Sequence, residues 1–386
     1  MRAFVFLCLS LCCYDAELTA APPPGFAELF NGRDFQGWTS GGGVSRSRVI
    51  EGVLVTAGAD EGAVTTIGEY ANFELRLEYR RSGGAIAEMG VRGVSQARIL
   101  GAAKEQEGRR ADESWQHMRM ILVGSRASVW VDDRLTVDHA ALENVALNGL
   151  PANRAKPLPA RGPIQLQSRA GEVRWRNLWL REIGNKEATE ILARRDARAF
   201  KTIFNGRNLE DWAGNLEAVE AKAGVLLWRA GQKGTVYWNR VLTDFVVRVE
   251  FVVPPGGNNG LALRYPGEGI PAYDGMGEIQ LRDDSATPLD KEERQAHGAL
   301  YGKIGSIRGY QLPVGEWNFQ EVTVRGSRII VELNGNIILD GDVSTLDPTT
   351  FMAKRPHPGN DRPSGYFGFA GHTDPFQFRQ ISIKEL

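Results

Sequence analysis

Cysteine is scarce in this chain of 386 residues, and its placement is informative. The three cysteines are Cys8, Cys12 and Cys13, so no later residue can form a disulfide, act as a thiol nucleophile or bind a metal through sulfur. Stability must then come from the burial of apolar side chains. A chain of this length can bury two cores of ordinary size, which makes two domains the first expectation.

An excess of charge of either sign is lacking as well. The 46 Lys and Arg residues balance the 47 Asp and Glu residues, which leaves a formal net charge of −1. No long-range field would therefore attract nucleic acid or an anionic membrane surface. The predicted partners exclude nucleic acid.

Long apolar runs are also missing. Residues 3–13 are apolar, follow the basic Arg2 and precede small residues, a pattern typical of an export signal at 1–21. The run is shorter than the roughly 20 residues that span a bilayer, so no transmembrane anchor is predicted in the mature chain. A lipid on Cys12 is disfavoured because Leu11 stands where a small residue is expected. The prediction is an exported protein, either periplasmic or extracellular.

What the chain does contain is an internal repeat. Phe-Asn-Gly-Arg at 30–33, followed by Trp38, recurs at 204–207, followed by Trp212 with the same spacing. Alternating apolar and polar residues follow each copy, and their period of two is typical of strands with one buried face. The chain therefore appears as two diverged copies of one unit.

The fold prediction is all-β, with two antiparallel β-sandwich domains in tandem. Short strand patterns separated by turn residues dominate both copies, and 45 glycines suit the tight turns between them. The predicted domains are residues 22–183 and 200–386. The charged segment 184–199 is interpreted as a linker that could form a short helix.

Six short motifs of the second copy occur in a characteristic order. They are the opening motif at 204–207, GGNNG at 256–260, GEIQL at 277–281, HGALYG at 297–302, GEWN at 315–318 and RQI at 379–381. Together they resemble the 3-keto-disaccharide hydrolase family, also described as 3-keto-glucoside 1,2-lyases and hydratases. The resemblance covers nearly all of the mature chain, with a degenerate first copy. It implies concanavalin- or laminarinase-like jelly-roll domains that hold sugar on the concave sheet.

The chemistry that this resemblance implies makes definite demands on a site. A ketone at C3 of a glucoside acidifies the C2–H bond, so a base can remove this proton, the C1 substituent can leave, and water can add back. The site needs a base near neutral pH, a donor for the enolate oxygen and an acid for the leaving group. The predicted function is cleavage of 3-keto-glycosides by a hydrolase or lyase. The alternative is a non-catalytic carbohydrate-binding or structural cell-surface protein.

Glu278 and His297 are the predicted catalytic pair. Glu278, Gln280 and Arg282 alternate along one strand pattern and share a face, where a carboxylate, an amide and a guanidinium suit a sugar. A solvated face with an ordinary ion pair is the alternative. Histidine is rare, with five in the chain, and imidazole suits proton transfer near pH 7. A satisfied core histidine is the alternative for His297.

Further residues are predicted to bind the substrate or a metal. The predicted substrate-binding residues are Arg264, Gln280, Tyr301, His372 and Asn258. Arg264 would hold the enolate oxygen, with a strand-edge salt bridge as its alternative. Asp283 and Asp284 leave a divalent cation open as a cofactor, because paired carboxylates in a loop suit hard cations. A keto-glycoside or oligosaccharide is the predicted partner.

The first copy lacks most of these residues. Nothing between 93 and 113 corresponds to the Glu278 strand or the His297 motif, and Arg92 alone makes no site. We interpret this half as a degenerate copy with a binding or structural role. Four tryptophans recur at matched positions and are predicted to anchor the cores: Trp38, Trp115, Trp212 and Trp317.

Overall fold

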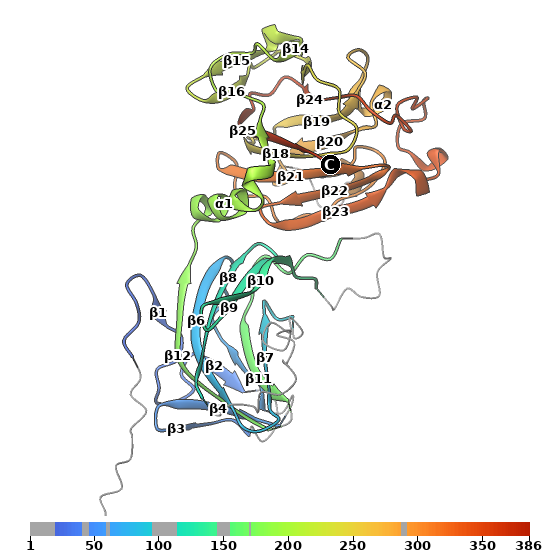
Figure 1. The fold of residues 1–386 in the computed structure, drawn as a ribbon. Coiled ribbons are helices and arrows are strands. Elements are labelled where there is room, and N and C mark those ends of the chain that lie inside the picture. The colour runs from blue at the N-terminus through green and yellow to red at the C-terminus, as the bar shows by residue number, and fades with distance from the viewer. Residues whose placement is uncertain are drawn as a thin grey trace, which may run out of the picture.

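The computed structural model describes two β-sandwiches joined by a short helix (Figure 1). The described residues are 20–40, 46–58, 62–94, 114–144, 155–169, 171–286 and 292–386. Almost all of the predicted export signal lies outside them. Within these ranges no helix is both long enough and apolar enough to cross a membrane.

The N-terminal sandwich consists of an eight-stranded and a four-stranded antiparallel sheet. In the larger sheet the order is β10 (Arg134–Ala141), β9 (Arg126–Val131), β8 (Gln116–Val123), β6 (Phe73–Arg81), β12 (Glu172–Glu182), β4 (Val53–Ala57) and β3 (Arg48–Ile50), with β1 (Ala27–Glu28) on β12. In the smaller sheet it is β2 (Trp38–Ser40), β5 (Val64–Thr66), β11 (Ile164–Arg169) and β7 (Ile86–Val91).

The C-terminal sandwich repeats this plan with one additional strand in the smaller sheet. The larger sheet has the order β15 (Val219–Lys222), β16 (Val225–Trp228), β25 (Gln377–Glu385), β18 (Phe245–Val252), β21 (Trp317–Arg325), β22 (Arg328–Leu333) and β23 (Asn336–Asp342), with β13 (Lys201–Thr202) on β25. The five-stranded sheet has the order β14 (Trp212–Gly214), β17 (Gly234–Trp238), β24 (Tyr366–Gly371), β19 (Asn258–Tyr265) and β20 (Gly277–Arg282). The additional strand β20 has no counterpart among the described residues of the first copy.

Helices are short in the described residues. They are α1 (Asn185–Arg194), α2 (Pro271–Asp274) and the 3₁₀ turns η3 (Ala197–Ala199), η4 (Leu216–Ala218), η5 (Glu293–Gln295), η6 (Val343–Thr345) and η7 (Pro348–Thr350). The all-β prediction is therefore confirmed.

The period-two patterns of the sequence put one strand face into each core. Phe73, Leu75 and Leu77 of β6 are buried in the first core. Phe245 and Phe251, at the two ends of the matching pattern in β18, are buried in the second. Burial of such side chains contributes roughly 1.5–3 kcal/mol each, so two separate cores account for stability without any disulfide.

Two of the four tryptophans that were predicted to anchor the cores are not buried in them. Trp38 and Trp212 are buried, as predicted. Trp115 and Trp317 are half-buried instead, and the guanidinium carbons of Arg176 and Arg379 lie 4.1 and 3.9 Å from the centres of their rings. Their strands direct them outward, where cation–π contacts hold them, so the prediction is wrong for this pair.

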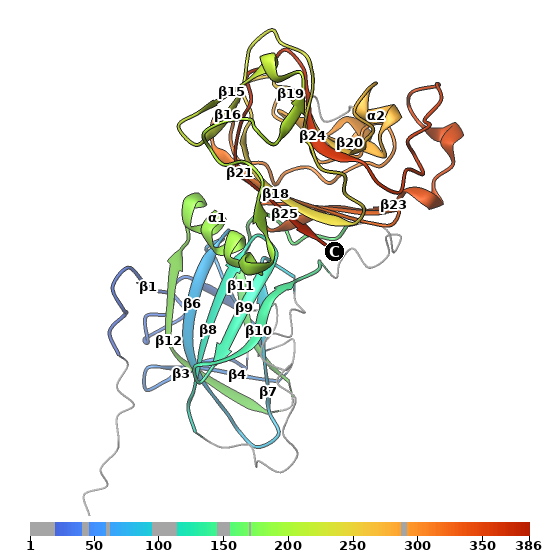
Figure 2. The ribbon, with the colours of Figure 1, turned by 45° about the horizontal axis from the view of Figure 1, so that its top comes forward.

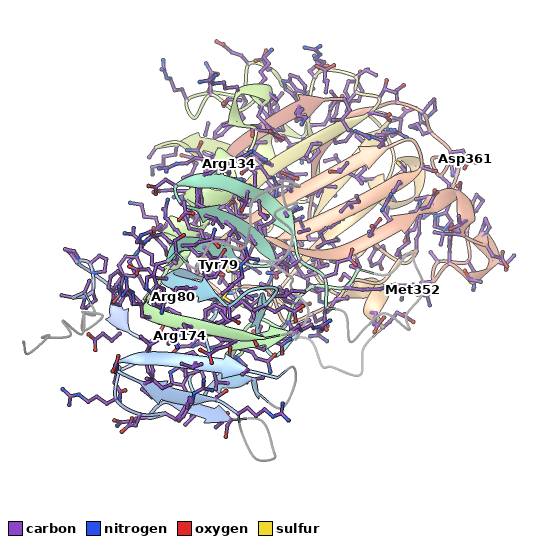
Figure 3. All side chains as sticks on the ribbon, turned by 60° about the horizontal axis from the view of Figure 1, so that its bottom comes forward. Tyr79, Arg80, Arg134, Arg174, Met352 and Asp361 are labelled. Carbon is purple, nitrogen blue, oxygen red and sulfur yellow. The ribbon has the colours of Figure 1, made fainter. Side chains whose placement is uncertain are left out.

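The outer face of the N-terminal eight-stranded sheet is rich in arginine. Arg80 of β6 lies opposite Arg174 of β12 (Figure 3), and Arg80 also lies over the ring of Trp115, 4.9 Å from its centre. Glutamates accompany these arginines: Arg174 and Arg48 both pair with Glu172. The face is a mosaic of ion pairs and aromatic rings, which matches the balanced net charge of the chain.

At the junction, α1 lies between the two sandwiches (Figure 2). Buried apolar side chains and an ion-pair network join the sandwiches there. Leu192 of α1 is buried with Val123 of one sandwich and Phe319 of the other. Glu332 accepts hydrogen bonds from Arg126 of the first sandwich and from Arg195, which directly follows α1. We keep 22–183, 184–199 and 200–386 as proposed boundaries of the domains and the linker.

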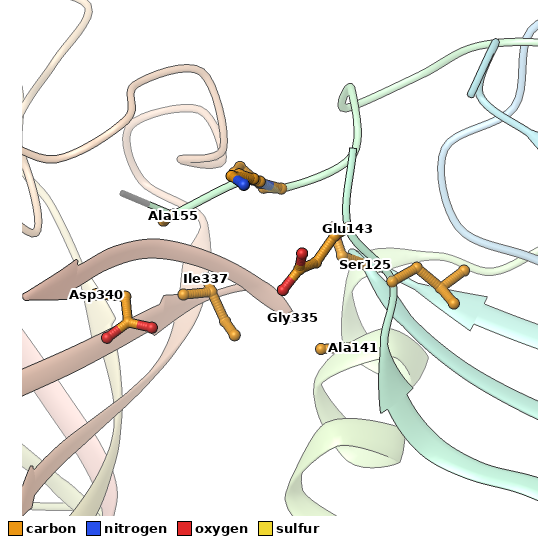
Figure 4. Close-up of a pocket in the computed structure, with 10 residues that line it drawn as sticks. Ser125, Ala141, Glu143, Ala155, Gly335, Ile337 and Asp340 are labelled. Atoms are coloured by element: carbon orange, nitrogen blue, oxygen red, sulfur yellow. The ribbon is translucent and has the colours of Figure 1, made fainter. Parts of the chain in front are cut away.

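A small cavity lies at this junction (Figure 4). Its volume is about 90 Å³, and its lining includes Ser125 and Glu143 from the first sandwich and Asp340 from the second. That space is large enough for ordered water between the polar groups that line it. The candidate site lies elsewhere.

Candidate active site on the outer face of the five-stranded sheet

The additional strand β20 carries the predicted Glu278 with the expected alternation. Ile279 and Leu281 enter the core, so Glu278 and Gln280 project from the opposite, outer face of the sheet. The neighbouring strand β19 places Ala262 and Gly260 directly opposite them. The small residues of β19 therefore give Glu278 and Gln280 room above the sheet.

Small side chains continue across the sheet towards an aromatic group. Gly368 of β24 lies beside Ala262, and Tyr237 of β17 lies beside Gly368. The Tyr237 ring packs against Tyr265 and Tyr366, with centroids 5.6 and 4.6 Å away. Small residues therefore occupy the middle of the outer face, with the carboxyl of Glu278 on one side and the tyrosine cluster on the other.

Glycine at position 260 is required by the carboxyl of Glu278. A Cβ atom at this position would lie 2.2 Å from Oε1 of Glu278, far inside van der Waals contact. The carboxyl thus lies over the backbone of β19. This close approach explains why the GGNNG motif ends in glycine.

The carboxyl of Glu278 is buried and has no charged neighbour to compensate it. The residue is only 6% exposed, and no described residue donates a hydrogen bond to its side chain. Burial raises the pKa of Glu278 to about 8. A carboxyl with such a pKa populates both protonation states near neutral pH, which suits a general base that must later return its proton.

Tyr273 and Tyr301 lie near Glu278 and were not predicted as a group, and Arg355 packs against Tyr273. Burial raises the pKa of Tyr273 of α2, and the charges of Tyr301 and Glu278 raise it further. The guanidinium carbon of Arg355 lies 4.4 Å from the centre of the Tyr273 ring. His357 packs edge-on against the same ring at 5.2 Å. The hydroxyls of Tyr273 and Tyr301 are therefore the candidate hydrogen-bond donors near the carboxyl.

Lys303 is a further buried group near this end of β20. Its Nζ donates to the carbonyl of Met276 at 2.9 Å, and burial lowers its pKa to about 8 although Asp361 opposes this shift. The ammonium also faces the Phe351 ring at 5.6 Å. No spacing in the sequence singles out Lys303, because its neighbours come from three separate loops.

The predicted binding residues Gln280 and Asn258 are in contact. Nε2 of Gln280 donates to Oδ1 of Asn258, and the backbone N–H of Asn258 donates to Asp374 at 3.0 Å. His372 lies at the end of this row, where burial lowers its pKa and Asp374 partly offsets the effect. The structure therefore brings Glu278, Gln280 and Asn258 together, with Tyr301 on the neighbouring segment and His372 at the periphery.

His297 does not join this group. The segment 298–301 pairs with the free edge of β20, and His297 at its start turns to the core side. There the imidazole stacks on Phe251 at 5.3 Å, and its Nε2 donates to Oε1 of Gln320 at 3.0 Å. Its Nδ1 accepts from the backbone N–H of Arg282 at 3.2 Å.

These contacts correct the predicted Glu278–His297 pair. Burial lowers the pKa of His297, although Asp284 opposes the shift, and both ring nitrogens already have partners. The strand alternation places Glu278 on the opposite face from the core that holds His297. The geometry favours the alternative of a satisfied core histidine that anchors the segment carrying Tyr301.

The guanidinium of Arg264 is also bound by other parts of the fold and does not face an open space. Its guanidinium donates to the carbonyls of Thr243, Gly326 and Arg362 and pairs with Asp244 at 2.8 Å. Every side of the group is engaged by the fold, so the geometry does not supply the predicted hold on an enolate oxygen. Tyr273 and Tyr301, near Glu278, are better placed for it.

The carboxylates proposed for a cation cap turns instead. Asp283 accepts from the backbone N–H groups of Gly256 and Ser285 at 2.8 and 2.9 Å. Asp284 accepts from the backbone of His297 and faces Arg308. Among the described residues no three His, Cys, Asp or Glu side chains are grouped as metal ligands. A bound divalent cation therefore stays a prediction, which the contacts of Asp283 and Asp284 do not support.

The chain belongs to the family described as the 3-keto-alpha-glucoside-1,2-lyase-like domain. The family model matches residues 25–99, 81–181 and 199–384, which together span both sandwiches. The second copy matches in one piece and the first in two overlapping pieces. The predicted family resemblance is confirmed, and membership makes the chain a carbohydrate-active protein. No curated protein matches it.

Solved structures with similarity to this chain each cover about half of it. A candidate glycosyl hydrolase from Parabacteroides distasonis shares 26% identity, covers 48% of this chain and 99% of its own, and gives a TM-score of 0.43. A second from that organism has 18% identity, coverages of 50% and 97%, and a TM-score of 0.42. A carbohydrate-binding module from Bacillus subtilis has 13% identity, coverages of 46% and 98%, and a TM-score of 0.31.

Proposed function

We propose that this chain is an exported enzyme that cleaves 3-keto-glycosides, with Glu278 as its general base. The observation that carries the proposal is the buried, unpaired carboxyl of Glu278, whose pKa is raised to about 8 above a floor of small residues. Family membership supports the substrate class. Export rests on the signal pattern at 1–21.

The proposed reaction begins at C2 of the keto sugar. Glu278 removes the C2 proton, and the electron pair of that bond forms an enolate whose oxygen is the former C3 ketone. The hydroxyl of Tyr273 or Tyr301, or the guanidinium of Arg355, donates to this oxygen. Collapse of the enolate breaks the C1–O bond, and protonated Glu278 returns its proton to the leaving oxygen.

Hydration then completes the cleavage. Glu278 accepts a proton from water while the hydroxide adds to C1, and the same carboxyl delivers that proton to C2. The sum of both steps is hydrolysis of the glycoside, without an oxidant or a covalent enzyme intermediate. Gln280 and Asn258 are assigned to the sugar hydroxyls, because their amides lie beside Glu278 on the same face.

The test is turnover of a 3-keto-glucoside with a chromogenic aglycone by the purified full chain. Glu278→Gln keeps the shape of the side chain and should lower kcat by roughly 10²–10⁴, the range expected for removal of a general base. Exchange of the C2 proton with deuterated solvent should fall in parallel. Glu250→Gln, which changes a glutamate paired with Arg379 on the other sheet, is the matched control.

Two results would contradict the proposal. Aglycone release that survives Glu278→Gln would remove this residue from the chemistry. Saturable binding of sugar without any product from wild-type protein would favour a non-catalytic carbohydrate-binding protein instead.

A further inference from the structure

The first copy carries a carboxyl where the second copy holds its candidate base. The two copies can be aligned through Arg92 and Arg264, which both have a left-handed backbone, with φ of 55° and 44°. Both are buried, and each donates to a carbonyl just before the long strand of its sandwich, Ala71 in one copy and Thr243 in the other. These shared contacts define which residues of β7 and β19 correspond in an alignment of the two copies.

In this alignment Glu88 occupies the position of Gly260. Glu88 stands four residues before Arg92, as Gly260 stands four residues before Arg264. In the second copy that position is left empty for the carboxyl of Glu278, which reaches over it from β20. The described residues of the first copy include no counterpart of β20, and its own Glu88 projects from this position.

The surroundings of Glu88 form a built polar site. Its carboxylate accepts from Nε2 of Gln167 at 2.6 Å and pairs with Nε of Arg169 at 2.9 Å. Glu88 and Gln167 are buried, whereas 37% of the Arg169 side chain is exposed. Gln165 lies opposite Gly90 on the same face, two residues from Gln167. The outer face of the four-stranded sheet thus presents a carboxylate, a guanidinium and two amides.

The chemistry of this group selects a ligand class. The charges of Glu88 and Arg169 offset each other, which disfavours an anion or a cation as the ligand. Carboxylate and amide oxygens accept from hydroxyl groups, while guanidinium and amide N–H groups donate to hydroxyl oxygens. Vicinal hydroxyls of a neutral sugar match this mixture of donors and acceptors, and the ion pair suits a fixed grip more than proton transfer.

We infer that the outer face of the four-stranded sheet is a second carbohydrate site, which binds neutral, unoxidised saccharide without turning it over. Its core is the group of Glu88, Gln167 and Arg169, with Gln165 beside it. The site does not depend on the reaction assigned to Glu278. The first copy therefore serves as a binding unit for substrate that has not yet been oxidised at C3.

The test uses the full chain carrying Glu278→Gln, titrated calorimetrically with cellobiose and with maltose. Saturable binding is expected for at least one of them. Adding Arg169→Ala or Glu88→Gln should weaken it at least about tenfold, or about 1.4 kcal/mol. Arg48→Ala, which breaks an exposed ion pair on the other sheet of this sandwich, should leave the affinity unchanged.

Three results would overturn the inference. The first is the absence of saturable binding of both sugars, and the second is binding that persists in the Arg169 and Glu88 variants. The third is binding that disappears with Gln280→Ala, which would place the sugar on the second copy. If Arg169→Ala lowers the melting temperature more than Arg48→Ala does, Gln165→Ala decides the matter, since Gln165 is not a member of the ion pair.

Discussion

The outer faces of the two smaller sheets differ in the partners they give to a carboxyl. In the second copy Glu278 is buried without a hydrogen-bond donor among the described residues, and its pKa rises to about 8. In the first copy Glu88 is equally buried but is held by Gln167 and Arg169. Both carboxyls lie at corresponding places on the outer face of the smaller sheet. Their hydrogen-bond and ion-pair partners therefore decide whether each is suited to move a proton or to hold a hydroxyl.

Among the substitutions that leave Glu278 itself in place, the largest effect should come from filling the space beneath its carboxyl. Gly260→Ala places a Cβ 2.2 Å from Oε1 of Glu278 and must push the carboxyl away, so kcat/KM should fall about 100-fold. Gly90→Ala at the neighbouring strand position of the first copy meets its nearest atom at 3.2 Å and should leave turnover unchanged. Equal activity of the two variants would show that the position of the carboxyl is unimportant.

The shared arginines should respond to mutation alike, through stability. Arg264→Ala and Arg92→Ala each leave buried carbonyls without donors, at a cost of about 2–4 kcal/mol in the free energy of unfolding. Chemical denaturation checks this, and kcat per folded molecule should change less than twofold. An Arg264 variant with intact stability but no turnover would restore this residue to the site.

The pH dependence of stability should distinguish Glu278 from an ordinary carboxyl. Its pKa in the folded state is raised from 4.5 to about 8, so the unfolded chain loses this proton at lower pH than the folded chain. The stabilisation is therefore complete below about pH 4.5 and is lost as the pH rises to about 8. Over that window wild type should lose stability relative to Glu278→Gln. Parallel curves would contradict the raised pKa.

The smallest effect is expected at the junction between the copies. Arg126→Ala removes one partner of Glu332 but leaves Arg195 in place, so the free energy of unfolding should fall by only about 1 kcal/mol. Turnover and sugar binding should both persist. A change in turnover or in sugar binding would mean that the junction influences the outer face of one of the smaller sheets. The comparison of the two faces would then have to include the junction.

The fold was predictable because its signals are local. Alternation along β6, β18 and β20 fixed which side chains enter a core, and it correctly put Glu278 and Gln280 on one outer face. The same local reasoning was wrong for Trp115 and Trp317, since their exposure depends on which sheet face their strands present. The roles of the site residues stay predictions.

The site was less predictable because its members meet only in three dimensions. His297 looked suitable by residue type, but the pairing of its segment with β20 turns it to Phe251 and Gln320. Tyr273 of α2 lies near Glu278, and Arg355 packs against Tyr273, although no spacing in the sequence links them. Glu88 was visible in the sequence, yet its meaning depends on the register shared with Gly260.

The ion pairs on Glu332 have a consequence for long substrates. Because Arg126 and Arg195 hold one carboxylate and Leu192 packs between both copies, the spacing of the two outer faces is set by the junction. A saccharide retained by the first copy would raise the effective concentration of its free end near the second. Chains too short to span the gap would gain nothing, so the protein would favour polymers over their fragments by avidity alone.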